Sequence, residues 1–204
     1  MAKSSIEKLN LFQQKLKTLE QIRRKQEVLF SEGKIVRRDI EEVYSALLLN
    51  AVASFEGFIE EFFIGLLAGQ ICSGHSNVRV RVKIKSYVVA RDVFLREKKY
   101  FNWLPYKNTK DAAKVFFTGG RPFTDITATE EKHLEKCLAI RNAIAHQSRH
   151  AIKTFRESAL TGLSLIPRDR RPKSFLRSQF SLAPPTTYYQ QLIAEILRIA
   201  DKLC

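Results

Sequence analysis

The chain has 204 residues, of which 45% are hydrophobic, so it can bury a sizeable core in one domain. Its most apolar run, residues 46–71, is too polar to span a bilayer because it contains Asn50, Glu56, Glu60 and Glu61. The first ten residues lack the apolar core of a signal peptide, so we expect a cytoplasmic protein that does not enter a membrane.

A net charge of +14 at pH 7 predicts a polyanionic partner. Residues 78–110 contain ten Lys or Arg and two acids, and residues 149–180 contain eight and two. These segments carry +8 and +6, which together make up the whole surplus. The alternative is that the basic segments only increase solubility.

Three widely spaced cysteines indicate neither a disulfide framework nor a zinc ribbon, so we expect them to be reduced.

Two long helices are predicted in the first third of the chain. Residues 5–32 contain no proline and place apolar side chains intermittently among charges, which indicates an amphipathic helix that ends near Gly33. Residues 39–71 have apolar side chains on nearly every side of a helix, so we expect this helix to be the most buried element.

Residues 78–85 alternate apolar and basic side chains, which is the period of a β-strand. We expect either a short hairpin or an extended stretch laid against the helices, because a lone strand is not stable. The basic positions of the alternation are candidate contacts to a polyanionic partner such as RNA: Arg79, Arg81, Lys83 and Lys85.

Residues 86–98 return to a helical pattern, and residues 109–117 predict a short helix that stops at two glycines. Between them, aromatic residues cluster around Pro105: Tyr100, Phe101, Trp103 and Tyr106. Aromatic side chains among lysines could stack on nucleic acid bases. Packing of this loop onto the helices is the more common use, and we favour it.

One long helix is predicted over residues 127–155, since Thr127 and Glu130 have the spacing of a capping box. Steps of three and four place one set of residues along one side: Leu134, Leu138, Arg141, Ala145, Ser148, Ile152 and Phe155. An arginine in such an apolar stripe needs an acid or an anionic ligand. Glu56 is the candidate acid, because Gly57 lets a neighbouring helix approach; the alternative is a solvated Glu56.

Residues 166–185 hold four prolines among five Lys or Arg, which predicts an irregular basic loop. Residues 186–203 then predict an amphipathic C-terminal helix. The second basic segment supplies further candidate contacts to such a polyanion: Arg149, Arg168, Arg170, Arg171 and Lys173.

The run RNAIAH at residues 141–146 resembles the signature of HEPN domains, small helical bundles that include many metal-independent ribonucleases. The runs LLLNAVASFEGFIEEFF and NWLPYKNTKDAAKVFFTGGRPFT are similar to ribosome- and defence-associated HEPN families. The resemblance covers residues 44–155.

This resemblance implies an all-α fold in which residues 1–204 form a single HEPN-like domain. Within it we expect a long N-terminal helix, a core with the signature, a basic loop and a C-terminal helix at residues 1–35, 36–157, 158–185 and 186–204.

Cleavage of RNA by its own 2′-hydroxyl needs a base, an acid and a cation beside the phosphorus. A histidine, with an unperturbed pKa of roughly 6.5, can hold or give a proton at neutral pH, so His146 is the candidate acid and base. The planar guanidinium of Arg141 can grip two phosphate oxygens. Asn142, one turn before His146, would orient the imidazole or the phosphate. In HEPN relatives an acid often pairs with the signature arginine, which here would be Glu56.

The resemblance further implies a C2 homodimer with facing signatures, and a toxin or phage-defence role with a neutralising antitoxin or defence-system partner. Ser148 stands where some HEPN toxins carry a tyrosine that is modified to silence them, so that regulation is not expected. We expect no cofactor and no metal, because the pairs His146/His150 and His133/Cys137 have no third ligand in the sequence. The alternatives are a non-catalytic RNA-binding module and a protein-interaction scaffold.

Overall fold

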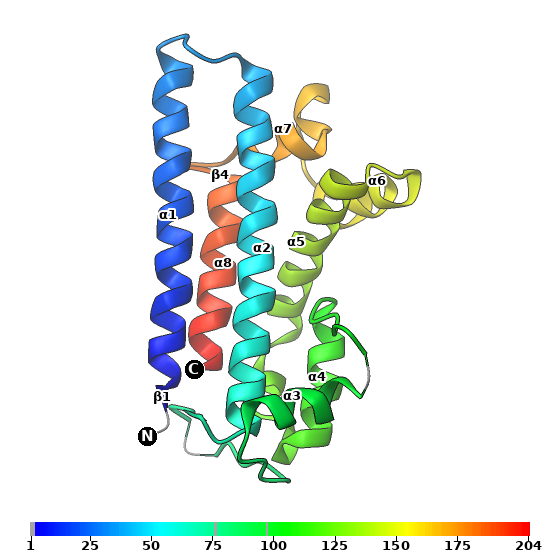
Figure 1. Cartoon of the computed structure of the whole chain (residues 1–204). Helices are drawn as coiled ribbons and strands as arrows, with labels where there is room; N and C mark the ends of the chain where they lie inside the picture. The colour runs from blue at the N-terminus through cyan, green and yellow to red at the C-terminus, as the bar shows by residue number, and fades with distance from the viewer. Residues whose placement is uncertain (1–2, 76, 97) are drawn as a thin grey trace. The chain divides into compact units, whose positions relative to one another are not determined.

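The structure is a computed structural model that describes residues 3–75, 77–96 and 98–204. It is mostly helical, so the all-α prediction is confirmed (Figure 1). The helices are α1 (Ser5–Ser31), α2 (Arg37–Leu67), α3 (Tyr87–Leu95), α4 (Tyr106–Phe116), α5 (Ala128–His146), α6 (Arg149–Phe155), α7 (Pro172–Arg177) and α8 (Tyr188–Leu203). Two short strand pairs accompany them: β1 (Lys3–Ser4) runs parallel to β2 (Ile71–Cys72), and β3 (Gln179–Leu182) runs antiparallel to β4 (Pro185–Thr187).

Both long N-terminal helices end where the sequence has a glycine. Gly33 and Gly69 adopt left-handed backbone angles, with φ of 69° and 65°, which glycine does without steric cost. The amide of Lys34 reaches back to the carbonyl of Leu29, and Gln70 bonds in the same way after α2, so each helix closes with a Schellman motif. The predicted end of α1 near Gly33 is therefore confirmed. Helix α2 ends at Leu67, four residues before its predicted end at Ile71.

The chain forms two compact units, each built from segments that are distant in sequence. The aromatic unit comprises Met1–Gln13, Ser54–Leu134 and Leu197–Cys204. The hairpin unit comprises Gln14–Ala53 and Glu135–Ile196. Helices α1, α2, α5 and α8 contribute residues to both units.

Aromatic rings fill the core of the aromatic unit. The ring of Phe63 on α2 lies 4.9 Å from that of Phe94 and 5.3 Å from that of Trp103. Trp103 and Tyr106 are buried, which confirms that the loop around Pro105 packs onto the helices. Tyr100 is 72% exposed and takes no part in this core.

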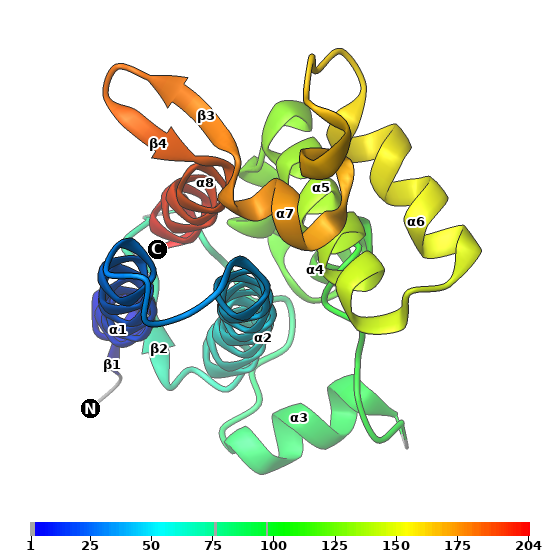
Figure 2. The same ribbon diagram turned by 90° about the horizontal axis from the view of Figure 1, so that it is seen from above.

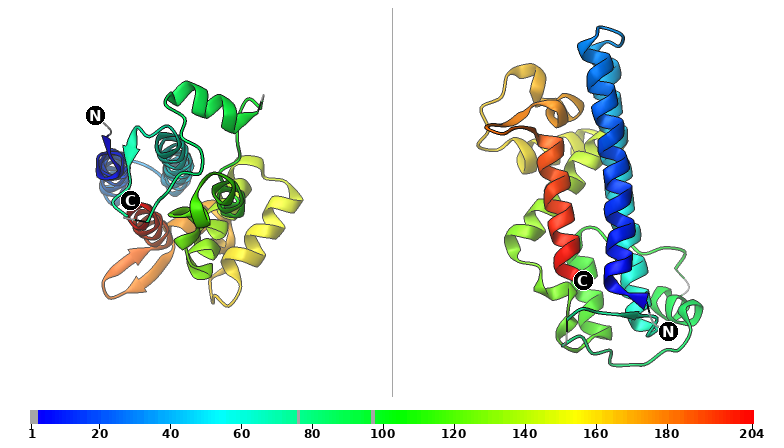
Figure 3. Two further views of the ribbon diagram at one scale, coloured as in Figure 1. Left: turned by 90° about the horizontal axis from the view of Figure 1, so that it is seen from below. Right: turned by 90° about the vertical axis from the view of Figure 1, so that its left-hand side faces the viewer.

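The end of the chain is fixed inside the aromatic unit, near the parallel strand pair (Figure 3). The carbonyl oxygen of Cys204 accepts hydrogen bonds from the Ser5 hydroxyl at 2.9 Å and from the Gly74 amide at 2.8 Å. A Cβ at position 74 would come within 2.7 Å of that oxygen, so this close approach requires glycine.

The hairpin expected at residues 78–85 is wrong, because both strand pairs lie elsewhere. The alternative of a stretch laid against the helices is confirmed at Val80, which makes one isolated antiparallel bridge to Phe117, whereas Arg81 and Val82 form a bend. Phe117 follows directly on α4 and precedes a 3-10 turn at Thr118–Gly120, so few residues are available for pairing. The prediction over residues 86–98 is confirmed as the shorter α3, which Ser86 caps, while residue 97 lies outside the described residues.

The prediction of an irregular loop at residues 166–185 is also wrong. A 3-10 turn at Pro167–Arg170, helix α7 and the β3–β4 hairpin occupy it (Figure 2). Phe175 and Leu176 of α7 are fully buried, and this burial holds the segment in place despite its prolines. The predicted C-terminal helix is confirmed as α8. Thr187 and Gln190 form a second capping box at its start.

Candidate functional site

The signature residues lie in the last two turns of α5, which ends at His146. Gln147 adopts a positive φ of 50°, and the Ser148 hydroxyl then accepts a hydrogen bond from the Ala151 amide at 3.1 Å. A residue in this left-handed region cannot continue an α-helix, and Ser148 serves as the N-cap of α6. The prediction of one continuous helix over residues 127–155 is therefore wrong, and the signature sits at a helix end.

The predicted apolar stripe of α5 is wrong in its orientation. The buried residues of this part of α5 are Leu134, Cys137, Ala139, Ile140, Ala143 and Ile144. Of the predicted stripe within α5 only Leu134 is buried, because the buried face turns toward Ile140 and Ile144, where apolar side chains follow at a spacing of three and four. Arg141 is half-exposed as a result, and Ala145 and Ser148 are exposed.

The structure brings Arg141 and Asn142 into direct contact. The guanidinium Nη1 of Arg141 donates a hydrogen bond to the side-chain oxygen of Asn142 at 2.8 Å. This bond fixes one edge of the guanidinium and leaves its remaining donors, together with the Asn142 amide nitrogen, for a ligand. His146 is exposed and follows Asn142 by four residues, which places the two within about 40° around the helix.

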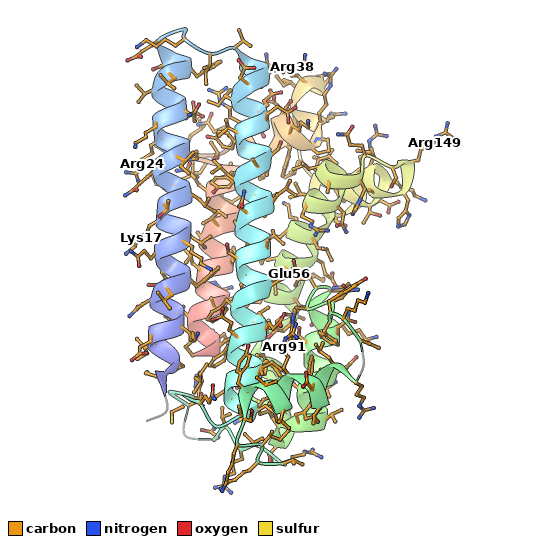
Figure 4. All side chains as sticks on the ribbon, in the orientation of Figure 1. Lys17, Arg24, Arg38, Glu56, Arg91 and Arg149 are labelled. Atoms are coloured by element: carbon orange, nitrogen blue, oxygen red, sulfur yellow. The ribbon has the colours of Figure 1, made fainter. Side chains whose placement is uncertain are left out.

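The predicted pairing of Glu56 with Arg141 stays a prediction. Glu56 is half-exposed on α2 and belongs to the aromatic unit, whereas Arg141 belongs to the hairpin unit (Figure 4). In the aromatic unit the next acid on α2, Glu60, accepts hydrogen bonds from Arg91 and from the Trp103 indole, both at 3.2 Å.

The four candidate RNA contacts of the first basic segment share one environment. Arg79, Arg81, Lys83 and Lys85 are all exposed. Within the described part of the chain, none of them has an acid partner. Val80 and Ile84, on the other side of the alternation, are half-buried. The four cations therefore face solvent, and Val82 between them is exposed as well.

The candidates of the second basic segment fall into different environments. Arg149 is exposed at the start of α6 and points away from the helix (Figure 4). Arg170 donates to the carbonyl of Leu165 at 2.9 Å. Arg168 and Lys173 pair with acids, whereas Arg171 has no acid partner among the residues described.

Three of these basic residues, Arg168, Arg171 and Lys173, line a pocket of about 690 Å³ within the hairpin unit. We call it the basic pocket; its walls are the first turns of α2, the end of α5 and the segment leading into α7. Helix α5 contributes Ala143 and Ile144 to its lining. Arg141 lies about 60° around the helix from Ile144, and His146 lies about 60° from Ala143, so the signature flanks the pocket. Arg141, Asn142 and His146 themselves do not line it.

The sequence interpretation missed Arg37 and Arg38, which line the basic pocket from α2. The only signal was an Arg-Arg pair directly before the predicted start of this helix at Asp39. Its meaning depends on residues 168–173, which lie some 130 positions away in the sequence. A local pattern could not join the two segments.

Neither predicted pair of metal-ligand spacing acquires further ligands. Within residues 3–75, 77–96 and 98–204, no cluster of three or more His, Cys, Asp and Glu side chains could hold a metal ion. Burial raises the pKa of the Cys137 thiol to about 12, so this cysteine is protonated at neutral pH and is a poor ligand.

Within the same described ranges, no helix combines the length and the apolar character needed to cross a membrane. Comparison of the chain with protein-family models, with curated proteins and with solved structures gave no match.

Proposed function

We propose that the chain is a HEPN-like, metal-independent endoribonuclease that acts as a toxin or phage-defence effector. The observation that carries this proposal is the arrangement at the end of α5. A half-exposed arginine is held by an asparagine, and an exposed histidine lies one turn further on. These three side chains have the chemistry needed to bind a phosphate and to move a proton beside it.

In the proposed reaction the 2′-oxygen of a ribose attacks the adjacent phosphorus, and the bond from phosphorus to the 5′-oxygen breaks. A base removes the proton from the 2′-hydroxyl, and an acid gives a proton to the leaving 5′-oxygen. The products are a 2′,3′-cyclic phosphate and a 5′-hydroxyl. His146 supplies the proton transfer, and Arg141 stabilises the charge on the phosphate oxygens.

One histidine cannot easily serve both sides of one phosphorus, and a two-fold symmetric dimer would bring a second His146 and Arg141. We therefore propose a C2 homodimer with the two signatures facing each other. Glu56 would hold Arg141 in position, and the candidate RNA contacts of both basic segments would bind the RNA backbone. A neutralising antitoxin or another defence component would control the activity.

The test is cleavage of a labelled single-stranded RNA in EDTA. His146→Ala should lower the cleavage rate by at least about 100-fold, the usual contribution of a general acid or base. The matched control is His150→Ala, because His150 is also exposed and lies in the first turn of α6. If His146→Ala cuts as fast as the parent, or if both variants lose activity equally, His146 is not the proton-transfer group.

The second candidate is an RNA-binding protein that does not cleave. It is favoured by four exposed cations of residues 78–85 that have no acid partner among the described residues, because such side chains can bind phosphates without any chemistry at α5. Replacing all four by Gln should flatten the dependence of RNA affinity on salt by about 0.7 in log-log slope for each lost contact. A parent that binds RNA in this way but leaves it intact in EDTA would favour this candidate.

A further inference from the structure

The basic pocket carries an excess of positive charge that the protein does not neutralise. Three of its cations have acid partners. Arg37 bonds to Glu41 at 2.6 Å and to Asp169 at 3.1 Å, Arg168 lies 3.5 Å from the same Asp169, and Lys173 pairs with Glu42. Three acids therefore balance three cations.

Arg38 and Arg171 remain. Both line the basic pocket, both are exposed, and within the described residues neither has an acid partner. Figure 4 shows Arg38 at the start of α2. The pocket thus has a surplus of two positive charges, each on a guanidinium that can bind two oxygens of one phosphate.

The rest of the pocket is partly apolar. Ala143 and Ile144 of α5 are buried, and half-buried Pro172 and Ile152 also contribute to the lining. The volume of about 690 Å³ falls within the usual range for small-molecule sites, roughly 300–1,000 Å³. A ligand that fits these walls combines a doubly charged group with a flat or apolar part.

We propose that the basic pocket binds a terminal phosphate carried on a nucleoside, with the phosphate between Arg38 and Arg171 and the base or sugar against Ile144 and Pro172. A phosphomonoester carries a charge of about −1.5 to −2 at pH 7, which matches the surplus of two. An internal phosphodiester carries only one negative charge and matches it less well. The ligand is either a free mononucleotide or the 5′-phosphate end of an RNA.

The proposed phosphate site uses other side chains than the proposed cleavage chemistry, because Arg141, Asn142 and His146 do not line the basic pocket. A protein that cuts no RNA but binds a nucleotide here would keep this inference and remove the nuclease proposal. A protein that cuts RNA but does not bind terminal phosphates would keep the nuclease proposal and remove this inference.

The test is calorimetric titration of the full chain with AMP and with adenosine. AMP should bind with a Kd below about 1 mM, at least about tenfold more tightly than adenosine, because adenosine lacks the charge-assisted bonds to the arginines. Arg38→Gln and Arg171→Gln should each weaken AMP binding by about tenfold. Arg171→Lys should restore only part of the affinity, since an ammonium lacks the planar fork of a guanidinium.

The matched control is Lys17→Gln, which removes one positive charge from the same unit. Lys17 is exposed on the outer side of α1, outside the pocket (Figure 4). AMP affinity should stay within about twofold of the parent, because only long-range attraction is lost. Equal losses in Lys17→Gln and the two arginine variants, or equal affinity for AMP and adenosine, would overturn the inference.

Two 2′-O-methyl RNAs that cannot be cleaved distinguish the sources of the phosphate. They share one sequence and end in a 5′-phosphate or a 5′-hydroxyl. A preference for the 5′-phosphate that disappears in Arg38→Gln identifies an RNA end as the ligand. AMP binding without such a preference identifies a free nucleotide.

Discussion

Glu130 shows how one side chain can begin a helix and also fasten a distant one. Its carboxylate accepts hydrogen bonds from the Thr127 amide at 2.6 Å, from Lys202 at 2.9 Å and from Arg198 at 2.6 Å. Burial alone would raise the pKa of this carboxyl, but the bonds from Lys202, Thr127 and Arg198 outweigh burial and lower the pKa to about 2. The charged carboxylate therefore holds the end of α8 against the start of α5 inside the aromatic unit.

A lowered pKa means that Glu130 stabilises the fold above its unfolded value near 4.5, and that this stability is lost as the pH falls toward 2. Glu130→Gln keeps an acceptor for the capping box but removes the charge. The difference in free energy of unfolding between the parent and this variant should narrow by on the order of 2 kcal/mol from pH 7 to pH 3. Urea unfolding at the two pH values measures it, and a constant difference would show that the ion pairs contribute no pH-dependent stability.

Of the two roles of Glu130, only the one in the capping box could be predicted from the sequence. The spacing of Thr127 and Glu130 predicted the capping box, since both partners lie within one turn. Nothing in the sequence joined Glu130 to Lys202, which is 72 positions away. The basic pocket could not be predicted for the same reason, because its residues are far apart in the sequence. The signature residues could be predicted, because they lie in one run of six residues.

At the scale of elements, the break between α5 and α6 decides how the signature is presented. Ser148 caps α6, and replacing such a cap by alanine costs about 1 kcal/mol. Ser148→Ala should therefore lower the free energy of unfolding by about 1 kcal/mol. Ser158→Ala is the control, because Ser158 is exposed in the π-helical turn that follows α6 and caps no helix. Chemical denaturation of both variants checks this; an unchanged Ser148→Ala would mean that the cap does not stabilise the break.

Most helices were predictable because apolar periodicity and glycine stops are local signals. The break at Gln147 was missed, because the three-and-four spacing appeared to continue from Arg141 through Ser148 to Phe155. The structured segment at residues 166–185 was missed for the opposite reason, since its prolines indicated a loop. There the buried Phe175 and the paired hydrogen bonds of Arg177 to Glu27, both at 2.9 Å, impose order that local composition does not encode.

At the scale of the whole molecule, the division into two units could not be predicted, because each unit joins segments that are far apart in the sequence. The proposed activity adds an expectation about assembly. One chain has a mass of 23.5 kDa. Light scattering at the protein concentration of the RNA assay should give about twice this mass. A monomer that still cuts RNA would remove the shared site from the proposal, since one His146 would then serve alone.

The central claim is that the chain cuts RNA by its own 2′-hydroxyl, without a metal, at the Arg141–His146 segment. The most direct measurement uses one RNA sequence and its 2′-deoxy counterpart, each incubated with the parent protein in EDTA, with the product ends identified by mass spectrometry. The account predicts 2′,3′-cyclic phosphate and 5′-hydroxyl ends from the RNA and no cleavage of the 2′-deoxy strand. Cleavage of both strands, or RNA products with 5′-phosphate ends, would contradict it.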